Sequence, residues 1–379
     1  MKKRIRETIE EVKNGDQKAV KETKVNSSNK GTQDEELMET IQNAGSGIKV
    51  IGTGGSGNNT MKRMQEIGIE GAELVAMNTD AQHLLSTPAN SKLLLGKEVT
   101  EGLGAGSDPK VGEKAAKEQK EEIKEQVDGL GLVFVTCGLG GGTGTGTAPV
   151  IARQAKELGA LSVAVVTLPF SVEGEKRMDN AIKGLKRLRE SADTVIVIPN
   201  DKLLEIVPEL PLNAAFKVAD EVLANAVKGI TEMITKPGLV NLDFADIRTI
   251  LKDGGAAMIG LGESDADETG ESRALEAVEE ALNSPLLDVD VSNAGKALVN
   301  VVGGPSMSLR EAEVVMEAVA SKIRRDSHII WGAMIDKTMK DNKIETMVVI
   351  AGGKIPFIDV EKGEEKLGPE IHLDMVGSE

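Results

Sequence analysis

A run dominated by glycine and threonine, Gly138–Thr147, constrains this chain more than any other stretch. It follows a compact apolar run, Leu132–Cys137, that predicts a buried strand. It precedes Pro149–Leu158, which predicts a helix with proline in its first turn. Glycine lets backbone N–H groups approach a ligand closely, and a helix N-terminus adds free donors and the positive end of the helix dipole. The stretch is therefore typical of a phosphate-binding loop.

Two other interpretations of Gly138–Thr147 fit less well. A flexible linker does not fit, because linkers do not join a buried strand to a well-formed helix. A Walker A loop does not fit either, because that motif needs a lysine after its last glycine and none follows here. We therefore predict a phosphate site built from backbone N–H groups and threonine hydroxyls.

The composition fits a soluble globular protein and argues against several functions. The 379 residues suffice for two domains with their own cores, and 40% of them are apolar and 28% charged. The net charge of −16 argues against non-specific nucleic-acid binding and against direct docking on an anionic membrane. Aromatic residues make up only 2% of the chain, which also argues against a base-stacking nucleic-acid reader.

The few cysteines and histidines and the short apolar runs exclude further classes of protein. One cysteine excludes an internal disulfide framework and suits a reducing cytosol, and with three scattered histidines it does not form a usual zinc site. The longest apolar run, Leu161–Phe170, is too short to span a bilayer, and the charged N-terminus has no secretory signal. We therefore expect a cytoplasmic protein that binds no metal through its own side chains.

A second glycine-rich turn leaves a dinucleotide site open at this point. The glycines of Gly52–Gly57 match the pattern G-x-G-x-x-G between a predicted strand, Ile48–Ile51, and a predicted helix, Met61–Ile67. This pattern is typical of a Rossmann NAD site, which also needs an acidic residue after the next strand. Asp80 follows the predicted strand Leu74–Met77, so that requirement is met.

A third glycine turn, Gly102–Gly106, favours a nucleoside triphosphate over NAD. Three strand-to-helix turns are expected to meet at one edge of a sheet, and a triphosphate with its metal can use several of them, whereas a pyrophosphate needs one. A dehydrogenase also lacks an evident proton relay, because His83, His328 and His372 are expected to lie far from every glycine loop.

Strands and helices alternate along the rest of the chain, which predicts a parallel, doubly wound α/β sheet with its ligand at the carboxyl ends of the strands. Apolar residues at helical spacing from Leu212 to Ile234 predict one long helix of roughly 35 Å between two α/β units. Further strands are predicted at Leu161–Leu168, Thr194–Ile198, Ala256–Leu261, Ala297–Val302, Ile329–Ile335 and Thr346–Ala351. Further helices are predicted from Pro109 to Val127, at Lys176–Glu190, from Ile247, at Glu271–Leu282 and at Leu309–Ile323.

Seven motifs together resemble the FtsZ family, the tubulin-like GTPases of prokaryotic cell division. The resemblance covers residues 48–355, and the set is highly specific because the motifs are independent of one another. They are Gly54–Asn59, Asn78–Asp80, Gly102–Gly106, the signature loop Gly138–Thr147, Pro169–Gly174, Pro199–Asp201 and Asn241–Asp246.

The resemblance implies a GTP or GDP site with Mg²⁺, in which each matched residue has a role. Gly54, Gly55, Ser56, Asn58 and Asn59 form the first phosphate loop, and Asn78 also binds the nucleotide. Gly140, Gly141, Gly142, Thr143, Gly144, Thr145 and Gly146 hold the β- and γ-phosphates, and Gly104, Ala105 and Gly106 border the γ-phosphate. Glu173 and Arg177 contact the ribose, Asn200 and Asp220 read the guanine, and Phe216 stacks on the base. The alternatives are a surface salt bridge for Glu173 and Arg177 and a core position for Phe216.

The loop Asn241–Asp246 is implied to be catalytic. The resemblance places Asn241, Asp243 and Asp246 on the face of the subunit opposite its own nucleotide, so that they act on the nucleotide of the next subunit in a head-to-tail stack. Helix capping is an alternative role for the two acids, and both roles can apply. Such an interface does not close, so it builds a filament.

The resemblance also implies domain boundaries and partners. The boundaries are 1–45 for a charged, flexible extension, 46–211 for the GTP-binding domain, 212–236 for the long helix, 237–355 for a smaller α/β domain that begins with the catalytic loop, and 356–379 for a polar tail. The implied partners are other copies of the chain and division adaptor proteins, with the membrane reached only through adaptors and no nucleic acid bound. The implied location is the cytoplasm, at the midcell division ring.

Two features leave alternatives open. The tail does not resemble the adaptor-binding peptide of bacterial relatives, which favours an archaeal-type member and leaves the N-terminal extension as a candidate adaptor site. A tubulin-like cytoskeletal GTPase outside division is the alternative function, and a NAD-dependent dehydrogenase is a weaker one. The intact pair Asp243 and Asp246 argues against a non-catalytic tubulin-like protein.

Overall fold

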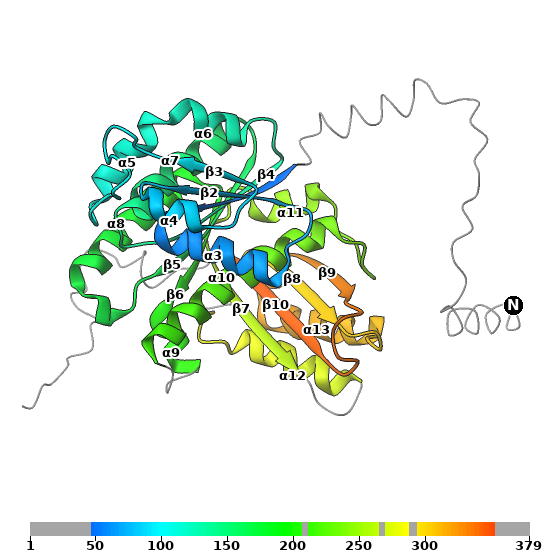
Figure 1. The fold of residues 1–379 in the computed structure, drawn as a ribbon. Helices are drawn as coiled ribbons and strands as arrows, with labels where there is room; N and C mark the ends of the chain where they lie inside the picture. The colour runs from blue at the N-terminus through cyan, green and yellow to red at the C-terminus, as the bar shows by residue number, and fades with distance from the viewer. Residues whose placement is uncertain (1–46, 207–210, 265–269, 288–293, 353–379) are drawn as a thin grey trace, which may run out of the picture. The chain divides into compact units, whose positions relative to one another are not determined.

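The computed structural model describes residues 47–206, 211–264, 270–287 and 294–352. In these residues the strands form a ten-stranded sheet in the order β3-β2-β1-β4-β5-β6-β7-β10-β8-β9 (Figure 1). The strands are β1 (Ile48–Thr53), β2 (Glu73–Asn78), β3 (Ser91–Leu94), β4 (Leu132–Gly138), β5 (Leu161–Leu168), β6 (Thr194–Pro199), β7 (Gly255–Ser264), β8 (Lys296–Gly303), β9 (His328–Ile335) and β10 (Ile344–Ala351). The helices are α3 (Gly54–Ile67), α4 (Ala81–Ser86), α5 (Pro109–Glu118), α6 (Lys120–Val127), α7 (Thr143–Glu157), α8 (Glu175–Ser191), α9 (Asn200–Ile206), α10 (Leu212–Thr235), α11 (Phe244–Leu251), α12 (Glu271–Leu282) and α13 (Leu309–Lys322), with a 3-10 turn η1 (Ser171–Glu173).

The first half of the sheet is parallel, as the alternation of strands and helices predicted. Every pairing from β3 across to β7 is parallel. Beyond β7 the sheet is mixed, because β10 runs antiparallel to both β7 and β8, whereas β9 is parallel to β8. The predicted doubly wound architecture is therefore confirmed, with a mixed C-terminal half.

The two α/β units share this sheet. A short parallel pairing, from Thr194–Gly255 to Ile196–Ala257, joins β6 to β7. Without it, both units would expose an unpaired strand edge to solvent, which natural sheets avoid. The smaller C-terminal unit is therefore continuous with the larger one through its backbone hydrogen bonds.

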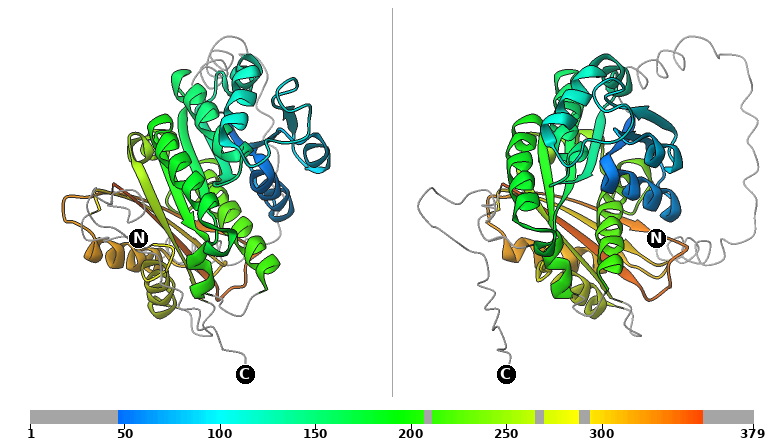
Figure 2. Two further views of the ribbon diagram at one scale, coloured as in Figure 1. Left: turned by 90° about the vertical axis from the view of Figure 1, so that its left-hand side faces the viewer. Right: turned by 60° about the vertical axis from the view of Figure 1, so that its left-hand side comes forward.

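Two apolar cores lie on the two faces of the sheet, and Figure 2 shows helices on both sides of it. Residues along a strand alternate between the faces, so Val133 and Val135 of β4 belong to the core beneath α7 and α8, whereas Phe134 belongs to the core beneath α3 and α10. All eight residues of β5 are buried. Strands covered on both faces read as continuous apolar runs, which is why the sequence revealed them.

Helix α10 confirms the predicted long helix almost to the residue. It has 24 residues and is about 36 Å long at the standard rise per residue. Its buried residues Leu223, Val227 and Ile230 lie in the core on its face of the sheet, and it contacts β5, β8, β9 and α3. The helix therefore runs along both halves of the molecule.

Two helices begin more than five residues earlier than the sequence predicted. Helix α7 begins at Thr143, so Pro149 lies inside the helix and not in its first turn, and α3 begins at Gly54, seven residues before the predicted start at Met61. Glycine disfavours helices intrinsically, but tertiary packing overrides that preference here. A Cβ on Gly57 would lie 2.5 Å from Thr136 O, so only glycine lets α3 approach β4 this closely.

Shorter elements were missed or merged. The sequence analysis did not predict β3, α4 or α9, and the helix predicted from Pro109 to Val127 is two helices that meet at Gln119. The predicted N-terminal extension and polar tail lie outside the described residues. No helix in the described part of the chain is long and apolar enough to cross a membrane.

Candidate functional site

Three glycine-rich turns meet at the carboxyl ends of the parallel strands. Gly54 opens α3 with φ +73°, and a Cβ there would lie 2.8 Å from Gly144 N in the first turn of α7. A Cβ on Gly142 would lie 2.8 Å from Asp108 N and 3.0 Å from Ala105 O, so the third turn also contacts the signature loop. The structure therefore brings together the three loops that the sequence singled out.

Threonine hydroxyls hold these loops in register. Thr79 Oγ1 and Thr143 Oγ1 are 2.6 Å apart, which joins the residue after β2 to the start of α7. Gly140 N donates to Thr145 Oγ1 at 2.8 Å, so the signature loop closes on itself. Thr145 is 1% exposed. Its hydroxyl therefore shapes the loop, and the backbone N–H groups at the helix start are the donors that face outward.

The turn Gly104–Gly106, expected to border the γ-phosphate, has open space beside both of its glycines. Gly104 and Gly106 have φ values of +88° and +57°, and a Cβ on either would contact no atom within 4 Å. Glycine is needed here for its backbone conformation and not for space. Gly104 N donates to Thr79 O at 3.0 Å, and Ala105 between the two glycines is buried.

Two of the asparagines implied to bind nucleotide point inward. In the amide orientation that satisfies its neighbours, Asn58 donates to Gly52 O and Met77 O at 3.2 Å each and accepts from Asn78 Nδ2 at 3.0 Å. Asn78 Oδ1 accepts from Thr79 N at 2.9 Å. Both side chains are buried, so they brace the loops from within.

The other residues implied to bind phosphate range from exposed to buried. Asn59 and Gly55 are exposed, and Ser56 is half-buried beneath Gly138. Gly141 is half-buried, and Gly146 is buried against Pro109 and Glu113 of α5. The cradle is thus lined mainly by backbone and supported by small side chains.

Asn200 and Asp220 lie on α9 and α10, beyond the carboxyl end of β6. Asn200 is 4% exposed, and its Oδ1 has no hydrogen-bond partner within the protein. Thr60 Oγ1 donates to Asp220 Oδ1 at 3.3 Å. A buried acceptor without a partner costs free energy unless a ligand or water supplies the donor, so Asn200 is suited to bind one.

Burial raises the pKa of Asp220 to about 7, and the hydrogen bond from Thr60 partly offsets this rise. The carboxyl group is therefore close to half-protonated at neutral pH in the protein alone. A ligand that donates hydrogen bonds to the carboxylate favours its charged form.

Phe216 lies one helical turn before Asp220 and is 39% exposed. Its ring packs edge-to-face on the buried Phe170 with centroids 5.0 Å apart and an interplanar angle of 89°. The Phe216 ring is therefore held by Phe170 on one side while the side chain remains accessible. A core position for Phe216, the alternative reading of the sequence, is wrong.

Glu173 and Arg177 bind each other. Arg177 Nε lies 3.0 Å from Glu173 Oε2, and Glu173 Oε1 accepts from Phe170 N at 2.9 Å. The salt bridge considered from the sequence is thus present. The pair lies beside the signature loop, because a Cβ on Gly140 would lie 2.8 Å from Arg177 Cγ.

The acidic loop lies at the other end of α7. Asp243 caps α11: its Oδ1 accepts from Asp246 N at 2.9 Å, and Asp246 Oδ2 accepts from Asp243 N at 3.2 Å. Arg248 of α11 donates to Gly159 O, just beyond the C-terminus of α7, at 3.2 Å. Because α7 has 15 residues and starts in the signature loop, about 22 Å of helix separates its two ends.

Asn241 shapes the approach to this acidic loop. Its Oδ1 accepts from Gly238 N at 2.6 Å, and the side chains of Asn241 and Asp243 are exposed. The capping role of Asp243 and Asp246 is therefore present in the structure. The structure does not bring these residues to the glycine loops of the same chain.

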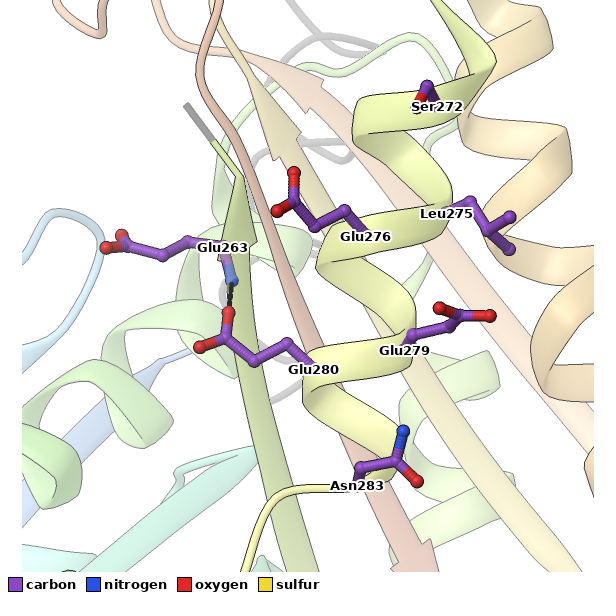
Figure 3. A pocket seen from close by; sticks show the side chains of 7 residues that line it. All are labelled: Glu263, Ser272, Leu275, Glu276, Glu279, Glu280 and Asn283. Atoms are coloured by element: carbon purple, nitrogen blue, oxygen red, sulfur yellow. Dashed lines mark hydrogen bonds between the residues drawn. The ribbon is translucent and has the colours of Figure 1, made fainter. Parts of the chain in front are cut away.

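A separate hollow of about 550 Å³ lies along α12 and the end of β7 (Figure 3). Four glutamates contribute to its lining, and Glu263 N donates to Glu280 Oε2 at 2.6 Å. It shares no residue with the loops described above. Within the described ranges, no group of three or more His, Cys, Asp or Glu side chains is placed to hold a metal ion.

Three residues at these loops, Thr60, Thr79 and His83, were not predicted from the sequence. Thr60 was not singled out, although it lies on the same helix as the first phosphate loop. Thr79 was quoted only as part of a motif. The expectation that His83 lies far from every glycine loop is wrong, because its ring is next to Gly55. In each case the contact joins separate elements, which sequence spacing does not reveal.

Comparisons with known proteins agree with this geometry. Residues 47–208 match the model of the Tubulin/FtsZ family GTPase domain, and residues 255–354 match that of the FtsZ family C-terminal domain. The fold and the loops thus define a tubulin-like GTPase that binds a guanine nucleotide.

The relatives specify the family. The chain is 58% identical over 348 residues to "Cell division protein FtsZ 1" of Archaeoglobus fulgidus, covering 91% of this chain and 93% of that protein. It is 58% identical to "Cell division protein FtsZ" of Methanothermobacter thermautotrophicus over 86% of this chain and 84% of that one. The chain belongs to the FtsZ family.

Solved structures show the same architecture. The structure "FtsZ dimer, empty" from M. jannaschii matches with a TM-score of 0.79 and 55% identity, over 85% of this chain and 92% of that chain. A protofilament of CetZ2 from Haloferax volcanii matches with a TM-score of 0.70 at 23% identity, over 81% of this chain and 93% of that chain, which shows a shared fold alone. The prediction of a tubulin/FtsZ-type fold is therefore confirmed.

Proposed function

We propose that this protein assembles head to tail into filaments during cell division and hydrolyses GTP at a site completed between neighbouring subunits. The observation that carries the proposal is the separation of the glycine loops from Asp243 and Asp246 along α7. One subunit thus supplies the nucleotide cradle, and only a second subunit can bring the acidic pair to it. The relatives named as cell division proteins support the role in division.

The base end of the site favours guanine. The Asp220 carboxylate accepts hydrogen bonds from the N1–H and N2–H₂ groups of guanine, whereas adenine offers no such edge. Asn200 Oδ1 is a further buried acceptor without a protein partner. Phe216, held by Phe170, offers a ring face for stacking on the base. A site built to accept these donors rejects a base that lacks them.

The phosphate end binds through backbone donors. The N-termini of α3 and α7 both open into the cradle, where free N–H groups and the helix dipoles favour an anion. Mg²⁺ commonly binds through phosphate oxygens and water with few protein ligands, which suits a site whose described residues form no acidic cluster. We include Mg²⁺ in the proposal as the counter-ion of the triphosphate; bound to the phosphate oxygens, it would neutralise part of the phosphate charge.

Asp243 and Asp246 orient the attacking water on the nucleotide of the adjacent subunit. Both side chains lie at the N-terminus of α11, and exposed Asp243 is free to face a neighbour. A carboxylate within hydrogen-bond reach of a water polarises it for attack. Because the cradle and the acids lie on different surfaces, the contact is heterologous and repeats without closing.

Adaptor proteins and a midcell location complete the proposal. The net charge of −16 disfavours direct contact with an anionic membrane, so adaptors would link the filament to it. A tubulin-like cytoskeletal role outside division has less support, because the structural match to CetZ2 is at 23% identity whereas the match to division proteins is at 58%.

A mixing experiment tests the shared site. Asp220→Ala lacks a competent base site and Asp246→Ala lacks an acid, yet each retains the other half. Neither alone should hydrolyse GTP at the normal rate, and a mixture of the two should hydrolyse it faster than the sum of the separate rates. A mixture that hydrolyses no faster than that sum would contradict a site shared between subunits.

A further inference from the structure

The imidazole of His83 lies against the first turn of α3. His83 is the third residue of α4, and a Cβ on Gly55 would lie 3.7 Å from its Cε1 and 3.8 Å from its Nδ1. Its Nε2 is 3.3 Å from Asn59 Oδ1. The ring therefore contacts both ends of the short segment Gly55–Asn59, which forms the first phosphate loop.

This position matters because the cradle has few cations. The turns Gly52–Thr60, Gly102–Gly106 and Gly138–Thr147 contain no lysine or arginine. Arg177 lies beside the signature loop, but its guanidinium is paired with Glu173. An imidazole becomes cationic as the pH falls from about 8 to 5, so a histidine at the cradle can add a charge that depends on pH.

Most charged groups on α3, α4, β2 and β3 near His83 have hydrogen-bond or ion-pair partners of their own. Asp80 caps α4 and accepts from the backbone N–H of His83 at 2.9 Å, and Lys92 of β3 donates to Leu85 O at 2.7 Å. On α3, Arg63 pairs with Glu66 and Glu221, and Lys62 is exposed. On β2, Glu73 pairs with Lys49 of β1. The phosphates of a bound nucleotide would add an anionic partner for the imidazole.

We propose that His83 is a nucleotide-binding residue whose protonation strengthens the hold on the phosphates, while its bond to Asn59 positions the first phosphate loop. The inference rests on the proposed guanine-nucleotide site and adds to it a cationic group from α4. Its pH dependence is opposite in sign to that of Asp220, which must be deprotonated to accept guanine.

The test compares the purified full-length protein with its His83→Gln variant. Glutamine retains a donor for Asn59 and cannot become cationic. The affinity of each protein for GDP is measured by calorimetry at pH 6 and pH 8. The effects of Asp220 and of the phosphate on affinity are common to both proteins, so they cancel in the ratio of the two affinities at each pH. At pH 6 the unmodified protein should bind GDP up to about five-fold more tightly, and the difference should shrink at pH 8.

Three controls make the result decisive. Guanosine lacks phosphates, so the two proteins should bind it equally at both pH values. His328→Gln, at the exposed start of β9, should behave as the unmodified protein. His83→Lys should retain the pH 6 affinity at pH 8. Parallel pH profiles for GDP in the unmodified and His83→Gln proteins would overturn the role of His83, whereas failure of the unmodified protein to bind GDP would overturn the proposed function.

Discussion

The hydroxyl of Thr60 donates to Asp220 Oδ1 at 3.3 Å, so the helix α3 is bonded to the helix α10, which carries the acid that we propose contacts the base. Thr60 is buried, and its hydroxyl also lies 3.1 Å from Ser56 O, so the two acceptors share one proton. A nucleotide that engages Asp220 therefore also affects the environment of α3. The base end and the phosphate end of the site are joined by this contact.

Asp220→Ala should weaken GTP binding by about five- to 150-fold, because guanine donors left unpaired in a buried site cost about 1–3 kcal/mol. The matched control is Glu221→Ala on the same helix, whose carboxylate pairs with Arg63 and does not face Thr60. Fluorescence titration with labelled GTP and ATP measures both variants. Equal affinity of the unmodified protein for GTP and ATP would contradict guanine recognition.

Guanosine binding should weaken as the pH falls below 7. The pKa of Asp220 is about 7 in the unliganded protein, and only the carboxylate accepts from guanine, so the affinity should fall about tenfold between pH 8 and pH 6. Binding at pH 7 should also release about half a proton per site, which calorimetry in buffers of different ionisation enthalpy detects. Asp220→Asn should bind weakly with a flat pH profile over this range.

The Asp220 carboxyl should make the folded protein more stable as the pH falls, whereas the same fall in pH should weaken guanosine binding. The pKa of Asp220 in the folded protein exceeds its ordinary value of 3.8, so the folded state binds the proton more tightly. This stabilising contribution is complete below about pH 4 and is lost as the pH rises through 7. Urea unfolding of the nucleotide-free protein at pH 5.5 and 7.5 should therefore show a smaller loss of stability with pH in Asp220→Asn. An equal loss in both proteins would contradict the raised pKa.

Assembly should require the γ-phosphate. Gly104 and Gly106 have positive φ values in the turn expected to border it, and Gly104→Ala adds a strain of roughly 1–2 kcal/mol there. Sedimentation should show polymer with GTP, much less with GDP, and less with GTP in Gly104→Ala. Gly295→Ala is the control, because its Cβ would meet only an Arg324 side-chain atom at 3.9 Å. Equal pelleting with GTP and GDP would argue against a nucleotide switch.

Asp243→Asn and Asp246→Ala should each bind GTP almost normally and hydrolyse it about 100-fold more slowly or worse. Asparagine is as good a helix cap as aspartate, so Asp243→Asn separates the loss of charge from the loss of the cap. Ser308→Ala removes the equivalent capping box of α13 and should lower stability by about 1 kcal/mol without slowing hydrolysis. The GTPase rate per subunit should rise with protein concentration. A constant rate down to concentrations where the protein is monomeric would exclude the shared site.

The buried strands and the glycine loops could be predicted because each leaves a local mark in the sequence. Strand β5 is a continuous apolar run of eight residues, and the signature loop is dense in glycine. The start of α7 at Thr143 could not be predicted locally, because the helix is stabilised there by close packing of Gly144 on β4 and Gly146 on α5. The pairing of β6 with β7 likewise joins residues about 60 positions apart, for which the sequence offers no local signal.

For the site, too, the sequence predicted some features and only the structure revealed others. Motifs pointed to Asn58 and Asn78, but only the fold reveals that both amides face inward and bond to each other. Asp220 was assigned from the family resemblance, whereas its raised pKa depends on burial between α3 and α10. Residue identity could thus be read from the sequence, and the chemical state of each group required the structure.

The placement of cradle and acids at the two ends of α7 has an arithmetical consequence for any stack of these subunits. In a stack built on the proposed shared site, a linear array of n copies contains n − 1 junctions, so the nucleotide of one terminal subunit would face no acidic pair. That end would retain its triphosphate while the interior is converted, which would give the two ends of the polymer different chemical compositions. The bound nucleotide would therefore distinguish one end of the filament from the other. Shorter filaments would hydrolyse less GTP per subunit than longer ones.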